Sequence, residues 1–147
     1  MNDADDTWDD ITEPRLRPEG ARILVVDDDG EMRELVSMRL ASDGYQVHEA
    51  VSGIDLLHVV ESIAVDHFPL DGIDLIVLDN LMPGLTGLDA IRRLRAAHLE
   101  TPMILMTAFP EPEVRREAAA LGVSVLPKPF SLELLTSAVL LNLLAAA

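Results

Sequence analysis

Short apolar runs that each stop at a polar residue recur along this chain, and they constrain its fold more than any other feature. The run at 23–26 (ILVV) is typical, since it is β-branched, continuous and followed by three aspartates. Such runs are typical of parallel strands that are covered on both faces of a sheet. Five segments are predicted as strands, the second of them at an edge: 23–26, 45–49, 75–78, 103–106 and 123–126.

Helical patterns separate the apolar runs. Gly44 and Gly122 stand where helices would end, and Ser131 is suited to cap the start of one. Five repeats of strand and helix predict an α/β fold, a doubly wound parallel sheet with right-handed crossovers. The predicted helices are 30–42, 53–65, 87–98, 111–121 and 131–145.

Composition narrows the class of protein. The chain has 147 residues, is 49% hydrophobic and carries a net charge of −15, which fits one acidic domain and disfavours direct binding to nucleic acid. It has no cysteine, so disulfides and thiol chemistry are excluded. No apolar run approaches the roughly eighteen residues of a membrane span, and the start lacks signal-peptide features. We therefore expect a soluble, cytoplasmic protein without a membrane partner.

The chain divides into two parts. Residues 1–20 carry seven acidic side chains and two arginines, a net charge of −5, together with two prolines and a glycine. This composition predicts a disordered acidic extension, and residues 21–147 are predicted to form the folded domain. Trp8 in the extension suggests a docking peptide, but a solvated tail is the favoured interpretation.

Polar residues follow four of the five predicted strands, and in an open parallel sheet ligands bind at that edge. They are 27–29 (three aspartates), Asp79, Thr107 and Lys128. Carboxylates gathered there would repel one another, and a hard cation such as Mg²⁺ relieves that repulsion. The lysine and threonine could bind a phosphoryl group. The pattern predicts Mg²⁺-dependent phosphoryl transfer to an aspartate, without identifying which one.

The ordered set of motifs resembles the receiver domains of response regulators in two-component signalling. The resemblance covers about residues 21–145. It implies a flavodoxin-like five-stranded parallel sheet in the order 2-1-3-4-5 with five helices, and a histidine kinase or phosphotransfer protein as the phosphoryl donor. The matching motifs are 25–29 (VVDDD), 78–84 (LDNLMPG) with Gly87, 106–108 (MTA) and 127–130 (PKPF).

The resemblance also implies a metal site. Asp79 would accept the phosphoryl group and ligate Mg²⁺ together with Asp28 and the backbone carbonyl of Leu81, while Asp27 would act largely through water. Asp29 receives no role.

The remaining catalytic roles fall at the ends of the later strands. Lys128 would pair with the phosphoryl group, and Thr107 and the Ala108 N–H would bind its oxygens. The Lys128–Pro129 peptide bond is expected to be cis.

Three features depart from the family pattern. Val125 stands where many receivers carry a tyrosine or phenylalanine that couples phosphorylation to the surface. Residues 66–72 form an insertion, interpreted as a surface loop. Pro110 and Pro112 stiffen the loop after Thr107.

We therefore expect a receiver domain without an output domain in this chain, a switch rather than a turnover enzyme. It would signal through a partner or by self-association through its last helix, where Leu132, Leu135, Val139 and Leu143 are predicted to face the core. That leaves leucines on the other faces of the helix: Leu134, Leu140, Leu141 and Leu144.

Two alternatives stay open. A haloacid-dehalogenase-type aspartyl phosphatase would use Asp27 and Asp29 as a D-x-D pair, but only Glu133 follows Lys128 as an acidic residue and no room is left for a substrate cap. A receiver-fold binding module that no longer switches is the other alternative. Val125 and the proline-rich loop favour it, whereas the complete set of aspartates, threonine and lysine favours retained chemistry.

Overall fold

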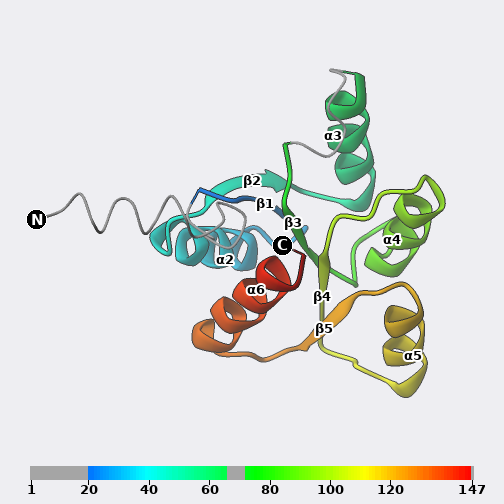
Figure 1. Ribbon diagram of the computed structural model, residues 1–147. Helices are drawn as coiled ribbons and strands as arrows, with labels where there is room; N and C mark the ends of the chain where they lie inside the picture. The colour runs from blue at the N-terminus through cyan, green and yellow to red at the C-terminus, as the bar shows by residue number, and fades with distance from the viewer. Residues whose placement is uncertain (1–19, 66–71, 147) are drawn as a thin grey trace, which may run out of the picture.

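The computed structural model describes residues 20–65 and 72–146, and its centre is one parallel sheet (Figure 1). The strand order is β2-β1-β3-β4-β5, which confirms the doubly wound fold and places the second strand at an edge. Nearly all of the predicted acidic extension (1–20) and of the 66–72 insertion lies outside the described residues. The strands are β1 (Arg22–Val26), β2 (Gln46–Ala50), β3 (Leu75–Asp79), β4 (Met103–Thr107) and β5 (Ser124–Pro127).

Five helices of the described chain cover the two faces of this sheet. One core cluster joins α3, α4 and α5 to one face, through residues such as Leu56, Ile91 and Ala118. A second cluster joins α2 and α6 to the other face, where Val36 and Leu135 are buried. Figure 1 shows the same division. The helices are α2 (Gly30–Ser42), α3 (Gly53–Val65), α4 (Gly87–Ala96), α5 (Pro112–Ala120) and α6 (Leu132–Ala146).

Most predicted boundaries lie within two residues of the observed ones, and the differences have local causes. Gly44 and Gly122 have φ of 101° and 71°, as expected for residues that end helices. Ser131 Oγ accepts the Leu134 N–H at 3.0 Å, so the predicted helix cap is present. Tyr45 is excluded from β2, since its N–H still donates to the Leu40 carbonyl at the end of α2.

The last helix has the predicted core stripe and an apolar outer surface. Leu135, Val139 and Leu143 are buried, and Leu132 packs beside them. Leu140 is half-buried. The other three leucines outside the core stripe are exposed: Leu134, Leu141 and Leu144. None of the helices in the described ranges is long and apolar enough to span a membrane.

Candidate functional site

Three carboxylates meet at the carboxyl ends of two neighbouring strands. Asp27 and Asp28 follow β1, and Asp79 is the last residue of β3. The two strands are paired, so their ends lie side by side. Oxygens of the three side chains all lie within 4.8 Å of one another, with Asp27 and Asp79 buried and Asp28 exposed. The structure therefore brings together the aspartates that the sequence placed at this edge.

The other predicted side chains come from β4 and β5. Lys128 Nζ lies 2.7 Å from Asp79 Oδ1, so the lysine reaches the acidic cluster. Thr107 is buried at the end of β4, and its carbonyl accepts the Lys128 N–H at 2.7 Å. The Lys128–Pro129 bond is cis, as expected.

Two predicted backbone contributors lie in exposed loops at the same edge. Leu81 follows β3 and Ala108 follows β4, each two residues or fewer beyond its strand. The roles of the Leu81 carbonyl and the Ala108 N–H stay predictions.

Burial and mutual repulsion raise the pKa of two of the carboxyl groups. The pKa of Asp27 rises to about 6, first because burial disfavours its charge, and also because Asp79 and Asp28 are negative. The pKa of Asp79 is raised mainly by burial, which outweighs the opposing hydrogen bond and charge of Lys128. One lysine therefore does not compensate the charge of three aspartates.

The residues present fit a hard divalent cation. Asp27 Oδ1 accepts the Asp29 N–H at 3.0 Å, whereas the buried Oδ2 finds no hydrogen-bond partner within the described chain. A buried carboxylate oxygen without a partner is rare unless an ion or water binds it. An all-oxygen set of three carboxylates matches the preference of Mg²⁺.

Asp29 has a structural role that the sequence analysis missed. Its Oδ1 accepts the N–H groups of Glu31 and Met32 at 3.0 and 3.3 Å, so it caps the start of α2. An aspartate directly before a predicted helix was the available signal. The cap anchors the acidic loop to α2.

The loop after β3 is held by close backbone packing. A Cβ on Gly87 would lie 2.5 Å from the Asp79 carbonyl oxygen and 3.0 Å from the Asn80 Cα. The Asn80 side chain accepts the Leu88 N–H at 3.0 Å, and the Asn80 carbonyl accepts the Gly87 N–H. Glycine at 87 thus lets the start of α4 pack directly under Asp79.

Comparisons with known proteins identify the family of this chain. Residues 23–140 match the family model described as "Response regulator receiver domain". Response regulator MprA of Mycobacterium avium is 38% identical over 115 residues, which cover 76% of this chain and 46% of the relative. Regulatory protein AtoC of Escherichia coli is 34% identical over 113 residues, covering 76% of this chain and 23% of the relative. The chain thus matches less than half the length of these relatives.

Solved structures give the same result. The receiver domain of Francisella response regulator 1452 superposes with a TM-score of 0.76 at 26% identity, covering 87% of this chain and all of that one. Vibrio cholerae chemotaxis protein CheY4 gives a TM-score of 0.73 at 29% identity, with coverage of 84% and 98%.

Fold and strand order define a flavodoxin-like domain whose acidic edge is its candidate site. The chain belongs to the response regulator receiver domain family of two-component signalling. This membership decides against the dehalogenase-type phosphatase.

Proposed function

We propose that this receiver domain accepts a phosphoryl group on Asp79 from a histidine kinase or phosphotransfer protein, with Mg²⁺ bound by the acidic cluster. The supporting observation is the set of three carboxylates within 4.8 Å of one another, of which Asp79 is the one paired with Lys128 at 2.7 Å. Asp79 is therefore the carboxylate of the cluster that has a cation beside it.

The chemistry follows from these contacts. A carboxylate oxygen of Asp79 attacks phosphorus, the bond from phosphorus to the donor nitrogen breaks, and an acyl phosphate forms. Lys128, freed from the carboxylate oxygen, would pair with the phosphoryl group. Thr107 Oγ1 already accepts the Phe109 N–H at 3.0 Å, so its own proton is available to donate to a phosphoryl oxygen. Bound Mg²⁺ would supply the charge that brings the anionic phosphoryl group and the carboxylates together.

Incubation with acetyl phosphate and Mg²⁺, followed by intact mass measurement, tests the proposal. The wild type should gain one phosphoryl mass, whereas Asp79→Asn should gain none. Asp89→Asn, which alters a partly exposed aspartate of α4 outside the cluster, is the matched control and should react like the wild type. Modification of Asp79→Asn, or an undiminished reaction in excess EDTA, would contradict the assignment.

The output of the switch is proposed to involve a partner or self-association at the outer surface of α6. Leu134 and Leu141 are 50% and 66% exposed there. Light scattering after size exclusion should show self-association that Leu134→Glu with Leu141→Glu removes. A wild type that stays monomeric with and without phosphorylation would leave only the partner version.

Val125 supports the alternative of a receiver-fold binding module that no longer switches. It is half-buried in β5 and packs against the α3–α4–α5 cluster, but it lacks the bulk of an aromatic side chain that would change position. Amide NMR with beryllofluoride should show shifts that extend from the site to β5 and α6. Shifts confined to the acidic edge would favour the binding module.

A further inference from the structure

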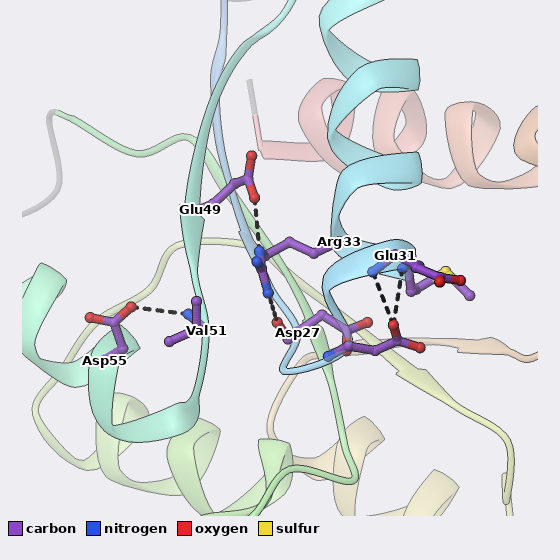
Figure 2. A network of polar contacts seen from close by, with 8 residues as sticks. Asp27, Glu31, Arg33, Glu49, Val51 and Asp55 are labelled. Atoms are coloured by element: carbon purple, nitrogen blue, oxygen red, sulfur yellow. Dashed lines mark hydrogen bonds and ion pairs between the residues drawn. The ribbon is translucent and has the colours of Figure 1, made fainter.

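An arginine of α2 reaches the start of the acidic loop from outside the cluster. Arg33 Nη1 donates to the backbone carbonyl of Asp27 at 2.7 Å, and its Nε donates to Glu49 Oε1 at 2.8 Å. Figure 2 shows the guanidinium lying between the loop after β1 and the strand β2. The Arg33 side chain is 20% exposed and that of Glu49 is 46% exposed, so the arginine is the better-buried partner.

The contact with Arg33 completes the backbone hydrogen bonds of Asp27. The Asp27 N–H donates to the Ala50 carbonyl at 3.2 Å, as the last link between β1 and β2. The Asp27 carbonyl lies beyond the paired part of the strand, and a buried carbonyl needs a donor. Arg33 supplies that donor. The carbonyl of the peptide group between Asp27 and Asp28 is therefore held by the Arg33 guanidinium.

We propose that Arg33 is a positioning residue that holds the carboxylates of Asp27 and Asp28 in the orientation that binds the cation. The carbonyl it contacts belongs to the planar peptide group that joins these two aspartates. Fixing that plane restricts the direction in which each of the two side chains leaves the backbone. This inference rests on the proposed Mg²⁺ site.

Arg33 is suited to this role because it acts on the backbone and not on the carboxylates. Within the described residues, the side-chain hydrogen bonds of Arg33 go to the Asp27 carbonyl and to Glu49, so the oxygens of the acidic cluster stay available for a cation. The three like charges repel one another, and a loop that could rotate would move them apart. An anchored peptide group opposes that movement.

The planar guanidinium explains why arginine stands here. Its Nε and Nη1 reach two acceptors on different elements in one fixed geometry, which a lysine ammonium does not reproduce. Glu49 orients the guanidinium through one oxygen, so the oxygen rather than the charge should matter. Glu49→Gln keeps that acceptor, whereas Glu49→Val removes it.

Isothermal titration of the full chain with MgCl₂ tests the proposal. Arg33→Met should raise the Mg²⁺ dissociation constant about 10-fold or more, the size typical of residues that orient metal ligands. The matched control is Arg39→Met, since Arg39 lies on the same helix and pairs with Asp43 and Glu133 away from the site. Arg39→Met and Glu49→Gln should bind Mg²⁺ within about 2-fold of the wild type, and Glu49→Val should bind more weakly.

A second readout separates positioning from loss of the fold. Phosphorylation by acetyl phosphate in Arg33→Met should need about 10-fold more Mg²⁺ for half the maximal rate, while the rate at saturating Mg²⁺ stays close to that of the wild type. Arg33→Lys keeps the charge and replaces Arg33→Met if the latter does not fold. It should also bind Mg²⁺ more weakly.

The outcomes distinguish this inference from the function it rests on. Equal Mg²⁺ binding by the wild type and Asp28→Ala, or no binding by either, would overturn the proposed metal site. Binding that Asp28→Ala abolishes but Arg33→Met and Arg33→Lys leave unchanged would keep the site and overturn the role of Arg33.

Discussion

The two ends of the sheet differ in what surrounds their partly buried cationic side chains. At the amino end, Arg95 of α4 donates to three backbone carbonyls, those of Leu99, Thr101 and Leu121, at 2.8, 2.9 and 2.8 Å. At the carboxyl end, Lys128 pairs with one carboxylate of a cluster of three. Arg95 thus binds neutral carbonyls, which do not repel one another. Lys128 lies beside three negative carboxylates, which do.

The amino end of the sheet stabilises the fold, whereas the carboxyl end destabilises it. The Arg95 guanidinium binds three neutral carbonyls and so joins the ends of α4 and α5 to the segment before β4. Close carboxylates with an orphaned oxygen cost free energy, which the buried core on both faces of the sheet must offset. A site that is costly without its ligand is thereby ready to bind one.

Loss of Arg95 should change the stability of the protein more than any other substitution proposed here. Arg95→Met leaves three carbonyls without their donor, and at about 1–3 kcal/mol for each unsatisfied group we expect the free energy of unfolding to fall by roughly 3 kcal/mol or more. Urea denaturation measures it. Arg93→Met, on the exposed face of the same helix, should change stability by less than about 0.5 kcal/mol. A similar, small loss of stability for both variants would show that the contacts of Arg95 at the amino end do not stabilise the fold.

The opposite sign is expected at the carboxyl end. The pKa of Asp27 is about 6 in the folded protein against 3.8 ordinarily, so the folded state binds this proton more tightly than the unfolded state. Without metal, stability should therefore fall as pH rises from about 4 to above 6, by up to about 3 kcal/mol. Asp27→Asn should remove this penalty and be more stable than the wild type at pH 7.5, with little gain near pH 4.

Urea denaturation in EDTA at several pH values checks this prediction. Saturating Mg²⁺ should shrink the advantage of Asp27→Asn, since the substituted amide binds the cation less well than a carboxylate. A wild type whose stability is flat between pH 4 and 7.5, or an Asp27→Asn protein that is less stable at pH 7.5, would remove the distinction between the two ends.

The carboxyl end was also the easier of the two to predict from sequence. Asp27, Asp79, Thr107 and Lys128 each end an apolar run, and parallel strands bring such residues to one edge whatever their order. The order itself came from family resemblance, because strand periodicity does not encode which strands pair.

The contacts of arginine side chains could not be predicted in this way. Arg33 reaches Asp27 and Glu49, and Arg95 reaches Leu121 26 residues away, through side-chain paths set by how helices pack on the sheet. On the sequence they are ordinary charged residues of amphipathic helices. Local signals such as the Asp29 cap were readable, whereas contacts between distant elements were not.

The smallest predicted effect concerns water at the carboxyl end. Hydrolysis of phospho-Asp79 needs a water in line with the bond to phosphorus. The side chains expected to flank its approach are Leu81 and Phe109, which are 56% and 58% exposed at this edge. Water can reach them, but neither offers a hydrogen bond that would orient it, and the Phe109 backbone is tied to Thr107 Oγ1.

Leu81→Asn with Phe109→Glu should therefore speed loss of the phosphoryl group about 10-fold, equivalent to about 1.4 kcal/mol of barrier. The decay of phospho-Asp79 after removal of the donor, at constant Mg²⁺, measures it. Val51→Asn with Ile54→Glu makes the same exchange at two exposed apolar residues after β2, and it should leave the decay unchanged. If both double variants decay at one rate, water near phospho-Asp79 is not limited by Leu81 and Phe109. Faster decay in the first alone would show that the carboxyl end combines closely held charge with an absence of groups that orient water, a combination that prolongs the phosphorylated state.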